Sequence, residues 1–303
     1  MIIISALLPV FGLIVLGYFL RYFALKNLLF WRRAEQLTYY ILFPSLLISK
    51  LALNDDAETT FLPIIISLYL MLVVGSILTF IAWKIIHFDR PVFTSVFQGS
   101  IRFNSYIGLA VAGQLFGEKG IAVAAVIIGL LIPIINIICV IILAFFNPKK
   151  RLNLQNTLGY IFRNPLILAC AIGTSLNISG IGLPGDFNQI LSSLGKLAVT
   201  FGLLTVGAGL KLRLITQSME AVISSTFIRL ILLPVFVFLI TDLFQIDIVT
   251  RSVLILFSGL PTASSGYILA RQMGGDAEVM AVIISVQSSM AAVTLPVLLF
   301  FTA

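Results

Sequence analysis

Residues 61–86 read FLPIIISLYLMLVVGSILTFIAWKII, and the only charged side chain in this stretch is Lys84, close to its end. A bilayer core of about 30 Å needs roughly 20 apolar residues for one helical crossing, so the segment is long enough to span a membrane. Its apolar residues are continuous instead of alternating, which excludes a transmembrane β-strand. The stretch therefore predicts a membrane-spanning helix.

The composition of the whole chain agrees with this prediction. Of its 303 residues, 60% are hydrophobic and 10% are charged, and the mean hydropathy is +1.13. An ordinary soluble domain has about a quarter of its residues charged, so soluble, disordered and nucleic-acid-binding classes are excluded. The two cysteines, Cys139 and Cys170, lie in apolar runs and are expected to be buried hydrophobes, not a disulfide.

Apolar runs of similar length recur along the entire chain, and they predict an all-α polytopic membrane protein with ten transmembrane helices. The predicted spans are 2–20, 34–53, 61–86, 92–115, 120–146, 157–178, 188–210, 219–241, 250–272 and 278–302. The first run has no positively charged start and no small-residue cleavage site, so we expect it to remain as a helix.

The basic residues orient these spans, because cytoplasmic segments carry an excess of Lys and Arg. One alternate set of connections and span ends holds Arg21, Lys26, Arg32, Arg33, Lys84, Arg90, Lys149, Lys150, Arg151, Lys211, Arg213 and Arg271, which is twelve residues. The other set holds three, namely Lys50, Lys119 and Arg251. Both termini are therefore expected outside the cytoplasm, and much of the net charge of +7 is a topology signal.

A weak internal repeat divides the chain into residues 1–150 and 151–303. An offset of 158 matches Gly108 with Gly266, Gln114 with Gln272, Gly117 with Gly275, and Glu118 with Asp276. Five spans per half is an odd number, so the second half must enter the membrane in the opposite direction. This is the inverted-topology repeat of many secondary transporters, in which broken helices form the binding site near the midplane.

Two spans carry polar interruptions at corresponding depths. Residues 99–108 read GSIRFNSYIG, and residues 258–266 read SGLPTASSG. Pro261 removes a backbone donor and clashes with the preceding turn, which favours local unwinding. Such backbone is tolerated at membrane depth only when it is buried in protein or lines a wet cavity, so the two breaks predict one shared site. Close helix packing by small residues is the alternative explanation.

These residues resemble the bacterial branch of the auxin efflux carrier family, relatives of the plant PIN carriers. The residues that carry the resemblance are Arg102, Asn104, Ile107, Gly108, Leu260, Pro261, Thr262, Ala263, Ala270, Phe43, Pro44, Leu295 and Pro296. Phe103 stands where plant carriers have proline, and Thr262 where they have asparagine, so auxin itself is not the expected substrate.

The resemblance implies a ten-helix secondary transporter of organic anions such as malate, malonate or auxin-like acids. It implies that the fourth and ninth helices are broken and cross near the midplane. It also implies a scaffold of the first, second, sixth and seventh helices, transport helices 3–5 and 8–10, a homodimer through the scaffold, and a place in the bacterial inner (plasma) membrane.

The charges within the spans point to an anion as the ligand. Arg102, Lys196 and Arg229 lie well within spans, whereas every Asp and Glu lies in a connecting segment or at a span end. We expect Lys196 to reach toward the interface and Arg229 to bind backbone carbonyls, while Arg102 lies within the break itself. The predicted substrate-binding residues are Arg102, Asn104, Ser105, Pro261, Thr262, Ser264, Ser265, Asn136, Gln287 and Ser288.

Other functions are less well supported by the sequence. The single histidine, His87, lies at a predicted helix end, and the spans hold no paired carboxylates, so an enzyme, a cofactor and a metal centre are not expected. A membrane-embedded carboxylate sensor and a cation-coupled symporter of the same fold remain as alternatives. Partners are expected to be the anion, the lipid bilayer and a second copy, with no nucleic acid.

Overall fold

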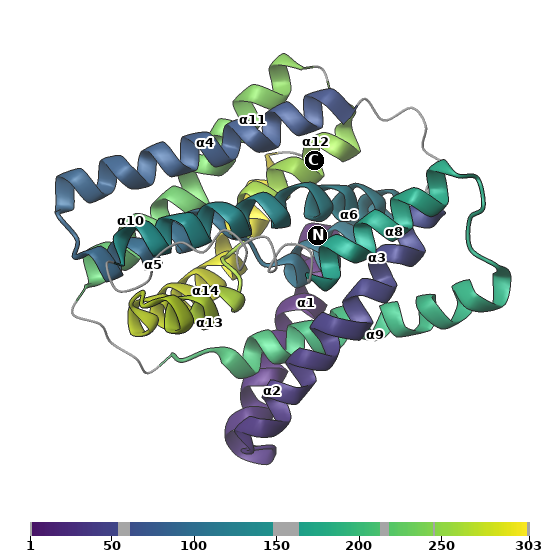
Figure 1. Cartoon of the computed structure of the whole chain (residues 1–303), viewed down its shortest axis with the longest axis horizontal. Helices are drawn as coiled ribbons and strands as arrows, with labels where there is room; N and C mark the ends of the chain where they lie inside the picture. Colours follow the sequence, from purple (N-terminus) through teal and green to yellow (C-terminus); the bar gives the residue numbers. More distant parts are fainter. Residues whose placement is uncertain (1, 54–60, 148–163, 213–217, 245, 302–303) are drawn as a thin grey trace. The chain divides into compact units, whose positions relative to one another are not determined.

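A computed structural model describes residues 2–53, 61–147, 164–212, 218–244 and 246–301 (Figure 1). All regular secondary structure in these residues is helical. Six stretches are long and apolar enough to cross a membrane, namely Ile3–Ala24, Leu62–Ile86, Arg90–Phe146, Gly185–Gly209, Met219–Leu243 and Ala277–Phe300. Two apolar helices are shorter, Pro165–Ile178 and Ile248–Ser258. The chain is therefore an all-α protein with several membrane-crossing helices.

One compact unit consists of residues Met1–Thr60, Tyr106–Pro133 and Gly159–Gly209. Its elements are α1 (Ile2–Phe19), η1 (Leu20–Ala24), α2 (Leu28–Leu37), η2 (Thr38–Leu42), α3 (Phe43–Ala52), α8 (Pro165–Ile178), α9 (Gly185–Gly209) and the first part of α6 (Ser105–Phe146). In this unit, α3 packs against α8 and α9, and α1 packs against α9.

Two glycines allow α1 and α9 to touch through their backbones. A β-carbon added at Gly17 would overlap the Leu204 carbonyl oxygen, and one added at Gly207 would overlap the Ile14 carbonyl oxygen. Small residues permit this approach, as is usual where membrane helices cross closely.

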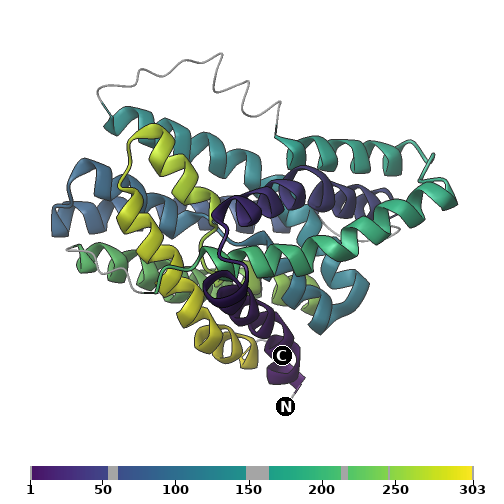
Figure 2. The same ribbon diagram turned by 90° about the horizontal axis from the view of Figure 1, so that it is seen from below.

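The other compact unit consists of Phe61–Ser105, Ile134–Leu158 and Leu210–Ala303. Its elements are α4 (Phe61–Ile86), α5 (Arg90–Ile101), the last part of α6 (Ser105–Phe146), α10 (Met219–Phe227), η3 (Ile228–Leu232), α11 (Leu233–Leu243), α12 (Ile248–Ser258), α13 (Ser265–Met273) and α14 (Ala277–Phe300). The α13–α14 pair lies at the yellow end of the colour scale (Figure 2).

The helical stretch that contains the predicted span 34–53 starts earlier than the span, at Leu28. Asn27 caps this start, since its side chain accepts a 2.8 Å hydrogen bond from Leu29 N–H. A π-helical turn, η2, which is wider than an α-helical turn, then leads into Pro44. The same arrangement recurs where the π-helical turn η3 leads into Pro234. Proline cannot donate to the preceding turn and crowds it, which explains both wide turns.

The predicted hairpins after residues 115 and 272 are present. The range of α6 includes Gly117, but the φ of 59° and ψ of −143° at this residue are not helical, so the chain turns here. A β-carbon at Gly120 would overlap the Ala112 carbonyl oxygen, a contact impossible in a straight helix, where eight residues span about 12 Å. In the second hairpin Gly274 has a φ of 81°, and Asp276 caps α14.

Two predictions concern residues outside the described ranges. The start of the predicted span at 157 and the division of the chain at residues 150 and 151 both lie there. The repeat itself stays a prediction, and each compact unit takes helices from both predicted halves.

Candidate functional site

The first predicted interruption is present in the structure. Helix α5 ends at Ile101, Arg102 has an extended ψ of 155°, and α6 begins at Ser105. The Arg102 N–H still donates to Gln98 O at 2.9 Å, so the helical pattern stops directly after it. Asn104 and Ser105 favour helix starts over helix interiors, which explains why a new helix begins here.

The second interruption is also present and is longer. Helix α12 ends at Ser258, and α13 begins at Ser265. In the last turn of α12, the Gly259 N–H donates to Ile255 O at 3.2 Å, and the Ser258 hydroxyl donates to the same carbonyl at 2.6 Å. Pro261 has no N–H to continue the helix, as the sequence predicts.

The two interruptions meet within one unit. The Asn104 N–H donates to Pro261 O at 2.8 Å. The Thr262 N–H donates to Gln287 Oε1 at 2.9 Å, and Gln287 Nε2 donates to Gly99 O at 3.1 Å. Gln287, a fully buried residue of α14, therefore connects the end of α5 to the second break.

Arg229 secures the carbonyl end of α12. Its Nε donates to Leu260 O at 2.7 Å, and its Nη2 donates to Phe257 O at 2.6 Å. The side chain is fully buried. These bonds confirm the prediction that Arg229 binds backbone carbonyls: Leu260 lies in the second break, and Phe257 lies in the last turn of α12 before it.

Arg102 brings together three of the predicted site residues. Its Nη1 donates to Ser265 Oγ at 3.2 Å, and its Nη2 donates to Asn136 Oδ1 at 3.0 Å. Arg102 is 6% exposed, and its Nε has no hydrogen-bond partner among the described residues. Both partners are neutral, so the positive charge of Arg102 is held in place without being neutralised.

Three other predicted residues form the backbone junction beside this cluster. Asn104, Pro261 and Thr262 are all buried. The Thr262 hydroxyl donates to Gln98 O at 3.5 Å, in addition to the bond from its N–H to Gln287. Thr262 and Gln287 hold the junction together, because they are hydrogen-bonded to each other and both donate to backbone carbonyls of α5.

The remaining predicted residues lie around the helix starts. Ser105 is the first residue of α6, Ser264 directly precedes α13, and both are half-buried. Ser288 is buried on α14, and its hydroxyl has no partner within the described ranges. Among the described residues, no hydrogen bond joins the side chain of Ser105 or Ser288 to the cluster that Arg102 forms with Ser265 and Asn136.

Gln98 and Ser225 are buried at the junction, and sequence reasoning did not select them. Gln98 is fully buried, and neither its amide oxygen nor its amide nitrogen has a partner in the described part of the chain. Ser225 accepts from Gln287 Nε2 at 3.2 Å. A buried polar group without a partner requires an explanation, such as a bound water or ligand. The available signal for Gln98 was a polar amide inside the predicted span 92–115.

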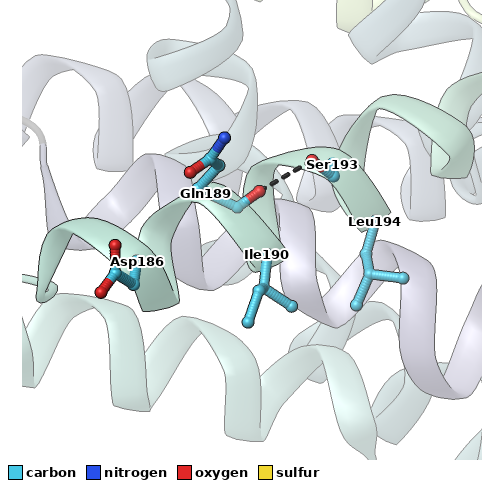
Figure 3. A pocket seen from close by; sticks show the side chains of 5 residues that line it. All are labelled: Asp186, Gln189, Ile190, Ser193 and Leu194. Atoms are coloured by element: carbon cyan, nitrogen blue, oxygen red, sulfur yellow. Dashed lines mark hydrogen bonds between the residues drawn. The ribbon is translucent and has the colours of Figure 1, made fainter.

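A surface groove lies elsewhere, on α9 of the other unit (Figure 3). It has a volume of about 430 Å³ and is lined by Asp186, Gln189, Ile190, Ser193 and Leu194. The Ser193 hydroxyl donates to Gln189 O within the same helix at 2.8 Å. The groove contains no basic side chain and no predicted site residue. Within the described ranges, no group of three or more His, Cys, Asp or Glu could hold a metal ion.

The sequence is similar to a known protein family. The family described as membrane transport protein matches residues 2–299. No curated protein matches the chain.

Proposed function

Because the chain belongs to the auxin efflux carrier family of membrane transport proteins, we propose that it is a secondary transporter of small organic anions. The family consists of transporters and not of enzymes, and the chain is a multi-pass membrane protein. The proposed substrates are carboxylates such as malate, malonate or auxin-like acids. The chain exports or exchanges them by alternating access, with the binding site where the two broken helices meet.

The proposed architecture is ten spans in two inverted repeats of five. The two breaks support it, because the offset of 158 relates Arg102 to Leu260 and Asn104 to Thr262. One compact unit groups α1, α2, α3, α8 and α9 with the first part of α6, and the packing of the first five together supports a scaffold made from them. The excess of basic residues in alternate connections supports termini outside the cytoplasm of a bacterial inner membrane, and we extend the proposal to a homodimer through the scaffold.

The environment of Arg102 carries the proposal. A cation within a membrane protein normally has an acidic partner, since placing it in the bilayer costs at least about 2.5 to 3.5 kcal/mol. Arg102 instead donates to Ser265 Oγ and Asn136 Oδ1, both neutral. A guanidinium can bind a carboxylate through two parallel hydrogen bonds, and its Nε is still available among the described residues.

Helix ends add to the attraction for an anion. Helix α6 begins at Ser105 and α13 begins at Ser265, directly after the two breaks. Each helix start carries a partial positive charge from N–H groups that have no partner within the helix. Carboxylates and phosphates bind readily at such ends.

The buried polar atoms without partners also favour the unit with the two breaks as the one that binds substrate. In the described part of the chain, the buried side-chain nitrogen and oxygen atoms without a partner belong to Ser67, Gln98, Arg102, Thr226, Arg229, Thr250, Ser288 and Thr294. All eight residues lie in the unit that contains the breaks. Buried polar atoms of this kind are expected where a ligand or water binds in part of the transport cycle.

Anion uptake into proteoliposomes tests the proposal. A panel of labelled mono- and dicarboxylates is offered to wild type, Arg102→Ala and Arg102→Lys, with Arg251→Ala as the matched control. Arg251 is a partly exposed arginine that pairs with Asp242 at 3.1 Å and is not one of the proposed site residues. Losing a charge-assisted bond of about 1.5 to 3 kcal/mol lowers uptake roughly tenfold or more at subsaturating substrate.

We expect Arg251→Ala to keep wild-type uptake. Arg102→Lys is expected to transport more than Arg102→Ala but less than wild type, because a lysine ammonium cannot form the two parallel hydrogen bonds of a planar guanidinium. Equal uptake by wild type and Arg102→Ala would remove the proposed role of Arg102. Binding of a carboxylate without flux in pure liposomes would favour the sensor. Uptake that requires Na⁺ would favour the cation-coupled symporter.

A further inference from the structure

Arg229 is an unusual charge to find inside an all-α membrane protein. It is fully buried, and its two hydrogen bonds go to backbone carbonyls of Phe257 and Leu260. Both acceptors are backbone oxygens, which carry no net negative charge. The charge of Arg229 is therefore balanced by backbone dipoles at the end of α12.

Among the described residues of this unit, no acidic side chain is available to pair with Arg229. The acidic residues described there are Asp89, Glu220, Asp242, Asp247, Asp276 and Glu278. Each one lies in the first or last turn of a helix or directly before a helix start. Arg229 lies nine residues after Glu220, which corresponds to about 13 Å along a helix and prevents contact.

The carbonyls that Arg229 binds are those that the break leaves without helical partners. The last carbonyls of any helix lack N–H donors, and the end of the helix carries a partial negative charge. In transporters with broken helices, carbonyls at such ends are typical ligands of a coupling Na⁺ or proton. At the end of α12, the Arg229 guanidinium occupies this position.

The wide turn η3 holds the guanidinium in place. Arg229 is its second residue, and Pro234 follows shortly after in α11. Segment η3 packs against α4, α5 and α14, so its backbone is enclosed on several sides. A side chain anchored in this way cannot leave and return as a free ion does.

We propose that Arg229 is a built-in counter-cation for the carbonyl end of α12, which replaces a mobile alkali cation at this position. The inference rests on the proposed transport function and specifies its coupling: the carrier binds no Na⁺ or K⁺ at the junction. Since the positive charge stays with the protein, a carboxylate crosses without a compensating alkali cation.

The first test uses wild-type protein. Thermal unfolding of purified protein, and carboxylate uptake into proteoliposomes, are measured in NaCl, KCl and choline chloride at equal ionic strength. We expect the same unfolding midpoint and the same uptake in all three salts. A saturable rise of either quantity with Na⁺ or K⁺ would overturn the proposal.

The second test replaces the tethered cation by a soluble one. Arg229→Ala is expected to unfold roughly 5 °C or more below wild type, because buried carbonyls lose their donors. Millimolar methylguanidinium is expected to restore part of this shift in Arg229→Ala, and to leave Arg251→Ala and Arg229→Lys unchanged. A response of Arg251→Ala equal to that of Arg229→Ala, or no response of Arg229→Ala, would contradict the proposal.

These measurements separate the inference from the proposed function. Unfolding midpoints require no transport, so a chain that carries no carboxylate can still show cation-independent stability and rescue by methylguanidinium. If Arg229→Ala does not fold, the salt series on wild type decides alone, and any alkali-cation dependence there overturns the inference.

Discussion

The backbone N–H of Asn104 donates a 2.8 Å hydrogen bond to the carbonyl oxygen of Pro261. Under the offset of 158, Asn104 corresponds to Thr262 and Phe103 to Pro261. A symmetric junction would pair the Thr262 N–H with Phe103 O, but that N–H donates to Gln287 Oε1. The junction of the two breaks is therefore asymmetric, and α14 supplies the missing acceptor.

Gln287→Leu is expected to destabilise the protein by about 2 to 4 kcal/mol, because it leaves the Thr262 N–H and the Gly99 carbonyl buried without partners. Thermal unfolding of the purified variant measures the effect. Ser288→Ala is the matched control, since the neighbouring Ser288 hydroxyl is buried and bonds nothing in the described structure. Equal midpoints for the two variants would show that Gln287 does not hold the junction.

Ser265 is expected to act on substrate through Arg102. Ser265→Ala should weaken carboxylate affinity less than Arg102→Ala does, and the double variant should be no weaker than Arg102→Ala alone. The expected coupling is about 0.5 to 1.5 kcal/mol, typical of one hydrogen bond. Ser193→Ala, whose hydroxyl donates within its own helix, serves as the control in the same binding assay. Additive effects of the two site substitutions would contradict a role through Arg102.

Gly207→Ala is expected to cost about 1 to 3 kcal/mol or more, because its β-carbon would overlap the Ile14 backbone where α1 and α9 cross. Gly209→Ala, two residues along the same helix, has no atom within 4 Å of the added carbon and should leave stability unchanged or raised. Unfolding midpoints of both variants test the crossing. A Gly207→Ala midpoint equal to that of Gly209→Ala would show that the two backbones are further apart.

Asp276→Ala is expected to lose about 1 kcal/mol of stability, because the Asp276 carboxylate caps α14 by accepting from Glu278 N–H at 3.0 Å and Val279 N–H at 2.9 Å. Asp276→Asn keeps a side-chain oxygen in the same place and should retain most of that stability. The backbone contacts of this turn, such as the 2.7 Å bond from Ser95 Oγ to Asp276 O, are unaffected by either change. Thermal unfolding midpoints of the two variants measure the difference. If Asn proves as harmful as Ala, charge and not capping is the relevant property.

Features that depend on a short stretch of sequence could be predicted. The apolar run at 61–86 became a single helix with the same bounds, because length and hydropathy alone decide such a segment. The interruptions at Arg102–Asn104 and around Pro261 were also predictable, since proline, asparagine and serine favour breaks and helix starts wherever they occur. The start at Leu28 was missed because α2 is more polar than a typical span, and hydropathy cannot place its first turn.

The sequence by itself determined that the chain is an all-helical membrane protein with two breaks and an arginine inside one of them. Only the tertiary structure decided the partners: Arg102 with Asn136 and Ser265, Gln287 with both breaks, and Arg229 with the carbonyls of α12. The physical reason is that helix formation and helix breaking depend on neighbours along the chain. Hydrogen bonds between residues distant in the sequence depend on how the helices pack, which no local pattern specifies.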